Sequence, residues 1–280
     1  MDLPVVHTIA VYCTHHTDME LARLPTGLND RRVSRIKAAA IHLLISLGIA
    51  ALAAALVFGI WYPYPYREIS GGRELFFLVV TVDVIMGPLI TLTLFNPKKK
   101  SLELRVDLTI VAILQLLALT YGLWTVYEAR PVHLVFEGDR FRVVHAVDIS
   151  TDLLQQVPQG INALPLTGPT MLGLREFRDQ NEKMQYTMAA IQGVQLAFRP
   201  DLWQPYSASV SQVLKASKPV SELTARFPKR ASNIEAVLSK VGRNGLSANY
   251  LPLIGRDKFW TAFLDPVTAE VIATMPLDSF

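Results

Sequence analysis

The stretch LFFLVVTVDVIMGPLITLTLF, residues 75–95, decides how the rest of the chain is interpreted. It is 21 residues long, and Asp83 is its only formally charged residue. At a rise of about 1.5 Å per residue, a helix of this length crosses the ~30 Å hydrocarbon core of a bilayer. The stretch therefore predicts a transmembrane helix that carries one acid.

Two similar runs flank it, Ala38–Tyr62 and Leu108–Tyr127, and neither contains a formally charged residue. A soluble domain rarely buries three such runs in succession. Proline cannot donate a backbone hydrogen bond, and it follows the first run at Pro63 and the second at Pro97. The sequence thus predicts an integral membrane protein with three transmembrane α-helices.

Basic residues outside the runs predict an orientation. The tail 1–37 holds five Lys or Arg and the connection 96–107 holds four, whereas 63–74 holds two arginines offset by two glutamates. Lysine and arginine favour the cytoplasmic side. We therefore expect a cytoplasmic tail at 1–37, a three-helix anchor at 38–127 and an extracytoplasmic domain at 128–280.

Residues 128–280 have the pattern of one α+β domain, with strands at both ends that join one sheet. A hairpin around Gly138 opens it, and a three-stranded meander over 249–275 closes it. Between them we expect helices at 151–156, 174–192, 207–216, 221–227 and 231–241, and a short strand at 194–198. The domain has 16 Lys or Arg against 15 Asp or Glu, so it has no strongly basic face for a nucleic acid.

Catalytic and metal-binding patterns are scarce. The domain contains no phosphate-binding loop, dinucleotide fingerprint or nucleophile elbow. Its two histidines, His133 and His145, fall on candidate strands and could face each other, but they are too few ligands for a metal site. Cys13, the single cysteine, precedes His15 and His16, and a disordered tail is favoured there over a metal site. We expect no enzyme activity, no metal and no cofactor.

Asp83 is the most informative polar residue of the spans. It lies about eight residues from the outer end of its run, ~12 Å deep, where a carboxylate costs ~2.5–3.5 kcal/mol on insertion scales. Tyr121 and Thr120 lie at similar depth and could donate a hydrogen bond, and Gly87-Pro88 predicts a bend beside it. A structural aspartate, recognition of a partner's cationic group and, least supported, a proton relay all stay open.

Small residues recur every four positions in the first run, at Ala51, Ala55 and Gly59. They share one helix face, and such faces let helices approach closely in lipid. Packing against the other two spans of this chain is the favoured interpretation. Docking of a partner's transmembrane helix is the alternative.

A set of motifs over about residues 36–150 resembles the type IV pilin accessory proteins, the TfpX/TfpZ family. The motifs are WYP at 61–63, DVIMGPL at 83–89, FNPKK at 95–99, LRVDL at 104–108 and YGLWTVY at 121–127. The resemblance does not include residues 1–35, and translation from either Met1 or Met19 fits it.

This resemblance implies a bacterial inner-membrane protein with a periplasmic C-terminal domain. It implies a non-enzymatic, chaperone-like function in type IV pilin stability or pilus assembly. The partners would be the major pilin and the assembly machinery. The periplasmic domain would hold the pilin head, and the bundle near Asp83 would hold the pilin helix. Folding, protection and delivery of the pilin all fit.

Two other classes of function stay open. A sensor with an extracytoplasmic ligand domain is weakened because the chain does not return to the cytoplasm after the third run. A membrane-tethered periplasmic enzyme would need acids, histidine and serine gathered in one pocket.

Overall fold

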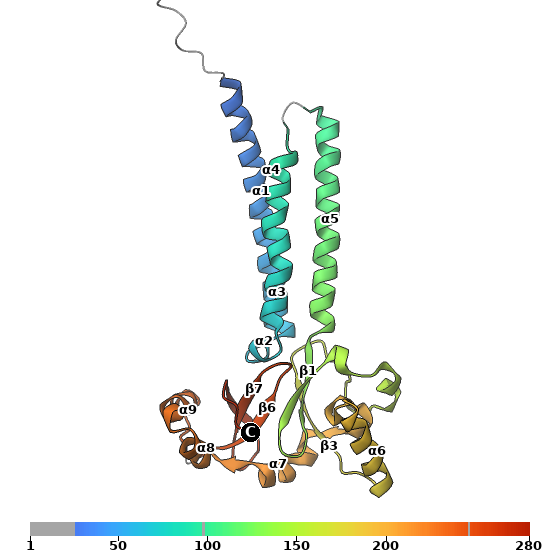
Figure 1. Ribbon diagram of the computed structural model, residues 1–280, viewed down its shortest axis with the longest axis vertical. Coiled ribbons are helices and arrows are strands. Elements are labelled where there is room, and N and C mark those ends of the chain that lie inside the picture. The colour runs from blue at the N-terminus through green and yellow to red at the C-terminus, as the bar shows by residue number, and fades with distance from the viewer. Residues whose placement is uncertain (1–25, 97–98, 246) are drawn as a thin grey trace, which may run out of the picture.

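The computed structural model describes residues 26–96, 99–245 and 247–280. Long helices form one end of the molecule, and a folded domain forms the other (Figure 1). The helices are α1 (Thr26–Leu56) with its π-helical end η1 (Val57–Trp61), then α3 (Gly72–Thr81), η2 (Val82–Met86) and α4 (Gly87–Leu94), and finally α5 (Ser101–Glu128). The three predicted spans are confirmed, and each helix begins before its predicted apolar run. The predictions about Cys13 and the start site lie outside the described residues.

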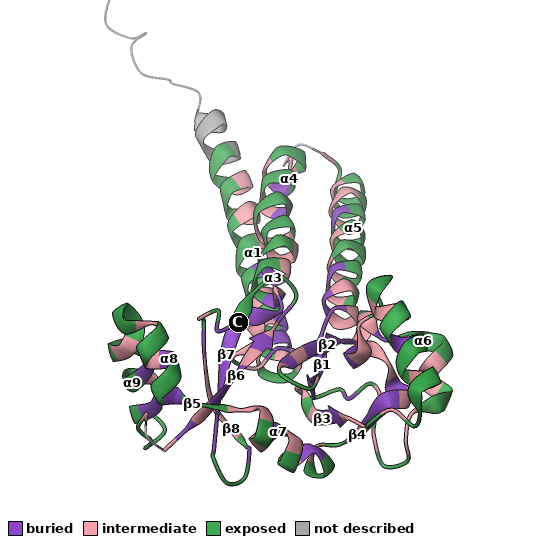
Figure 2. Ribbon diagram, turned by 60° about the horizontal axis from the view of Figure 1, so that its bottom comes forward, coloured by how far each residue is buried: buried purple, intermediate pink, exposed green. Residues whose placement is uncertain are grey.

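The outer surfaces of the three spans are apolar and uncovered by protein (Figure 2). Leu44, Leu52 and Leu78 are between 68% and 75% exposed. At most 17% of the most hydrophobic window of any span is buried within the protein. Water-facing surfaces of soluble proteins rarely carry apolar patches of this extent, so lipid must cover these helices.

The domain is built on one mixed sheet. Its strands are β1 (Pro131–Phe136), β2 (Phe141–His145), β3 (Thr170–Leu174), β4 (Trp203–Pro205), β5 (Lys218–Pro219), β6 (Asn249–Ile254), β7 (Phe259–Leu264) and β8 (Val271–Met275). They lie in the order β4-β3-β1-β2-β6-β7-β8, with β5 paired to β6. Pairs β1–β3 and β2–β6 are parallel. The hairpin, the meander and the joining of both ends in one sheet are confirmed.

Short helices complete the structure. One of them, α2 (Tyr66–Ile69), lies between the first two spans. The others lie between strands of the domain. They are α6 (Gln180–Ile191), α7 (Val210–Ala216), α8 (Val220–Arg226) and α9 (Ala231–Ser239), with 3-10 turns η3 (Ala146–Asp148), η4 (Thr151–Gln156), η5 (Leu196–Phe198), η6 (Pro200–Leu202), η7 (Tyr206–Ser209) and η8 (Pro228–Arg230).

Two local predictions in the middle of the domain are wrong. The helix expected at 174–192 begins only at Gln180, because Leu174 pairs in β3 and the Asp179 carboxylate caps the helix by accepting from the Glu182 N–H at 2.7 Å. The strand expected at 194–198 is the 3-10 turn η5.

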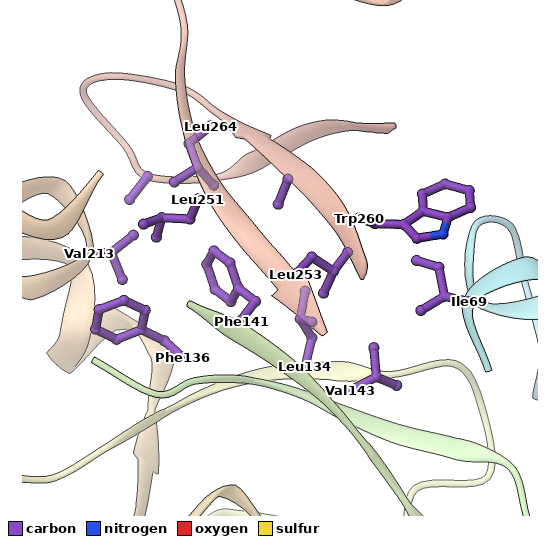
Figure 3. Packing of buried hydrophobic residues seen from close by; sticks show 12 residues of the cluster. Ile69, Leu134, Phe136, Phe141, Val143, Val213, Leu251, Leu253, Trp260 and Leu264 are labelled. Carbon is purple, nitrogen blue, oxygen red and sulfur yellow. The ribbon is translucent and has the colours of Figure 1, made fainter. Parts of the chain in front are cut away.

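A residue from between the first two spans completes the core of the domain. Ile69, on α2, is 1% exposed and packs in one cluster with Leu253 and Trp260 (Figure 3). The approach is so close that a Cβ at Gly255 would lie 2.2 Å from Ile69 Cγ2. Burial of one such side chain stabilises a fold by about 1.5–3 kcal/mol. The inter-span loop is therefore part of the folded domain.

Polar contacts fix the same junction. The Tyr62 hydroxyl donates to the Val126 carbonyl at 3.1 Å, and the Tyr62 side chain is fully buried. Lys258 Nζ donates to the Glu68 carbonyl at 2.8 Å and pairs with Glu74 Oε1 at 3.1 Å. Loop, span ends and the β6–β7 turn are held together.

His133 should make the stability of the domain depend on pH. Burial lowers the pKa of His133 to about 4, and the hydrogen bond to the Ala163 carbonyl only partly offsets this. The unfolded chain binds the proton below pH ~6.5. Neutral His133 therefore makes its full contribution to the free energy of unfolding above pH ~6.5. That contribution, about 3 kcal/mol, is lost as the pH falls from ~6.5 to ~4.

The measurement is urea unfolding between pH 4 and 7, followed by the fluorescence of Trp203, whose ring lies 4.6 Å from that of His133. The variant His133→Gln should lose this component of the pH dependence. An identical pH profile for the two proteins would contradict the assignment.

Candidate functional site

The second transmembrane helix widens at Asp83. Residues Val82–Met86 form the π-helical turn η2 between α3 and α4, and Pro88 follows in the first turn of α4. Proline has no N–H for the carbonyl of Val84, four residues earlier, and its ring would crowd that carbonyl. A wider turn relieves this, and such turns are frequent at functional sites.

Gly87 lets side chains from the other two spans reach this turn. A Cβ at Gly87 would lie 1.9 Å from Gln115 Nε2 of α5 and 3.1 Å from His42 Nε2 of α1. Gln115 Nε2 donates to the Asp83 main-chain carbonyl at 3.4 Å. The missing side chain of Gly87 therefore makes room for a polar contact among all three spans.

Further polar side chains extend the cluster toward α1. His42 Nδ1 lies 2.5 Å from Thr91 Oγ1, and Ser46 and Thr91 are buried. Polar groups at membrane depth seek partners within the bundle. No motif in the sequence marks these residues as a site. The available signal was that uncharged polar side chains interrupt each apolar run.

The Asp83 carboxylate is the unsatisfied part of the cluster. Both of its oxygens are buried and have no hydrogen-bond partner among the described residues. Two cavities adjoin it. One, of about 230 Å³, is lined by His42, Ser46, Asp83 and Gln115. The other, of about 360 Å³, runs between α4 and α5 as far as Asp107. An unpaired carboxylate beside space in an apolar setting is suited to a cation or a hydrogen-bond donor.

The hydrogen bonds expected from Tyr121 and Thr120 to Asp83 are wrong. Tyr121 is 69% exposed on the lipid side of α5, and the Thr120 hydroxyl donates to the Leu116 carbonyl at 2.7 Å. The second span begins at Gly72, so Asp83 lies eleven residues, ~16 Å, from that end. This greater depth places it opposite Gln115.

The small-residue face of the first span points away from the other two spans. Ala51, Ala55 and Gly59 are exposed, and a Cβ at Gly59 would have no atom within 4 Å. Ala53 and Val57 are buried in the bundle instead. The favoured interpretation, packing within the chain, is therefore wrong, and the face is free for another helix or for lipid.

The sheet domain has a separate cavity of about 570 Å³ at the ends of β1 and β3. Its lining contains neither histidine nor serine. Of its two acids, Glu137 is paired with Arg142 at 2.7 Å and Glu176 accepts from Gln212 Nε2 at 3.2 Å. His133 and His145 bind elsewhere, to Thr170 and to Asp148. No group of three metal-ligating side chains occurs in the described parts of the chain.

Fold and site together define a class of integral membrane protein, with three spans, a sheet domain at one end and an unpaired acid inside the bundle. Residues 30–71, which include α1 from Asp30 and the loop with Ile69, match the family described as "Fimbrial assembly protein FimB". No solved structure matches the chain.

Curated relatives extend this match to most of the chain. A fimbrial assembly protein of serogroup I from Dichelobacter nodosus is 36% identical over 246 residues, which are 87% of this chain and 95% of the relative. The serogroup E1 protein is 35% identical over the same length and shares. The protein of serogroups C1 and C2 is 46% identical over 123 residues, 44% of this chain and 92% of the relative. The chain belongs to the FimB family of fimbrial assembly proteins.

Proposed function

We propose that this protein is a non-enzymatic accessory protein of type IV pilus assembly that holds a pilin in the membrane, as the TfpX/TfpZ resemblance implies. The main observation that supports this proposal is the Asp83 carboxylate, which is buried and unpaired beside two cavities. The relatives' description as fimbrial assembly proteins supports the process.

The shape of the bundle supports a helical occupant. Helix α5 stands apart from α1 over the half of the bundle that is distant from the domain (Figure 1). The cavity walls on this side are mainly apolar, with Ile45, Ile49, Leu116 and Leu119 around the polar cluster. An apolar pilin helix fits such walls, and its positively charged N-terminus is a suitable partner for Asp83.

The orientation belongs to the same proposal. The tail 1–37 and the connection 96–107 lie in the cytoplasm, the anchor 38–127 crosses the inner membrane, and the domain 128–280 lies in the periplasm with the pilin head. Lys99 pairs with Asp107 at 2.5 Å at the cytoplasmic end, and three further basic residues of 96–107 supply the positive charge there.

Substitution Asp83→Asn should reduce pilin capture by at least about tenfold, because a hydrogen bond to a charged group contributes ~1.5–3 kcal/mol and each 1.4 kcal/mol is tenfold. The measurement is photo-crosslinking of pilin from position 116, which lines the cavity, in cells that express both proteins. Fimbriae on the cell surface are counted in parallel.

Two controls isolate the site. Glu103→Gln removes an exposed acid of α5 that lines neither cavity, and it should leave crosslinking from position 116 unchanged. A crosslinker at Leu117, which is 63% exposed and is not among the cavity residues, should capture little pilin. Unchanged crosslinking and piliation in Asp83→Asn would remove the charge from the proposal.

A further inference from the structure

The loop between η4 and β3 exposes apolar side chains beside the ends of the spans. Leu164 is 37% exposed and Leu166 is 61% exposed, while Pro165 between them is buried. Figure 1 shows the segment that follows β2 extending sideways directly beneath the end of α5. Protein therefore covers the centre of this loop and leaves its two leucines open.

Hydrogen bonds fix the loop to the ends of two transmembrane helices. The Gly168 N–H donates to the Ile60 carbonyl in η1 at 3.0 Å. Arg130, two residues past α5, donates from Nε to the Pro165 carbonyl at 3.3 Å and from Nη1 to the Tyr127 carbonyl at 2.9 Å. These hydrogen bonds therefore fix the position of the loop along the membrane normal, relative to the ends of the spans.

The aromatic residues near the end of α5 indicate that the loop lies at the membrane surface. Tyr121 and Trp124 are exposed, with ring centroids 6.0 Å apart, in the last two turns of the helix. Such rings favour the headgroup layer. Leu164 and Leu166 flank a residue that is bonded to Arg130, so they lie at the edge of the same layer.

The absence of charged residues favours lipid over other partners for this surface. The chain has no charged residue between Asp152 and Arg175, a gap of 22 residues, although 31 of the 153 residues of 128–280 are charged. A segment without charges can enter the headgroup and acyl boundary without desolvating an ion. The surface is also continuous with the lipid-covered spans.

We propose that loop 163–167 is a membrane contact, with the Leu164 and Leu166 side chains inserted into the bilayer surface next to the span ends. The contact forms with lipid alone and does not depend on pilin. It holds the domain at a fixed angle to the bilayer.

The test places a cysteine at position 166 in the full-length protein, with Cys13→Ser, labels it with the fluorophore NBD and reconstitutes it in phosphatidylcholine/phosphatidylglycerol nanodiscs. Lipids with a nitroxide near the top of the acyl chain should quench at least half of the fluorescence. Met184→Cys is the matched control, because Met184 is 60% exposed and lies on α6, far from the spans in Figure 1. Its label should not be quenched.

Quenching at 166 no greater than at 184 would overturn the proposal. So would protection of the 166 label that arises only when pilin is added, because the surface would then bind protein. A label at position 164, in the same background, must agree with that at 166. The quenching samples contain no pilin, which is added only to a parallel set, so the result for lipid is separate from the test of Asp83.

Discussion

Substitution Ile69→Ala should destabilise the sheet domain by about 2–5 kcal/mol, although residue 69 belongs to the connection between two transmembrane helices. The side chain is 1% exposed and packs against Trp260 and Leu253 in the core. Its removal leaves a cavity in addition to the lost transfer free energy. The measurement is urea unfolding of the detergent-solubilised protein, with the emission of Trp260 as the local reporter.

Val267→Ala is the matched control. Val267 is 77% exposed in the turn between β7 and β8, so its truncation should change the unfolding free energy by less than about 0.5 kcal/mol. Gly255→Ala should disrupt the same contact from the β6–β7 side. A Cβ there would lie 2.5 Å from the Ile69 main-chain oxygen, which cannot rotate away. Equal stability of Ile69→Ala and the unsubstituted protein would show that the loop does not complete the core.

Substitution Gly87→Leu should abolish pilin capture and surface fimbriae while leaving the sheet domain folded. A side chain at this position displaces the end of Gln115, which donates to the Asp83 main-chain carbonyl, and the end of His42, which bonds to Thr91 of α4. We expect the new side chain to fill the 360 Å³ cavity that Gly87 lines and to push Gln115 and His42 in the lining of the 230 Å³ cavity. Crosslinking from position 116 should then fall to the level of the Leu117 control.

Gly48→Leu is the corresponding change at an open site. A Cβ at Gly48 would have no atom within 4 Å, so the new side chain extends into lipid and should leave assembly intact. Unfolding followed by Trp260 should match the unsubstituted protein in both variants. Normal fimbriation with Gly87→Leu would exclude the cluster as the pilin site.

The spans could be predicted because each signal is local. An uncharged run of 20 or more residues, a following proline and flanking basic residues lie within short windows. The hairpin around Gly138 and the meander were also predictable, since their strands alternate and their turns contain glycine, proline or aspartate. In these elements local preference and tertiary structure agree.

The missed elements depend on distant partners. Strands β3 and β4 are five and three residues long. They exist because β3 pairs with β1 and β4 pairs with β3, which no local pattern encodes. The η5 turn forms instead of a strand at 194–198, where the Trp203 indole donates to the Ala197 carbonyl at 2.9 Å. Short segments adopt whatever pairing the neighbouring fold offers.

The arrangement of the candidate residues could be predicted in part, while their role as a site stays a prediction. Asp83, Gly87 and Pro88 do lie together at one distorted turn, because they are adjacent in sequence. The prediction of Tyr121 and Thr120 as neighbours of Asp83 is wrong because the apolar run begins at Leu75, whereas the helix begins three residues earlier at Gly72. Gln115 and His42 meet this turn only through the relative rotation of three helices, which composition does not determine.

The insertion of Ile69 into the sheet domain also sets an order of events during synthesis. Lys258, which holds the Glu68 carbonyl, is made 190 residues later, and at about 5–20 residues per second this is roughly 10–40 s. Throughout that interval the inter-span loop lies at the membrane surface with the Ile69 side chain exposed. In every copy whose translation stops before β6 and β7, Ile69 stays accessible to proteases. Ile69 becomes protected only when these last strands have been made and have folded over it.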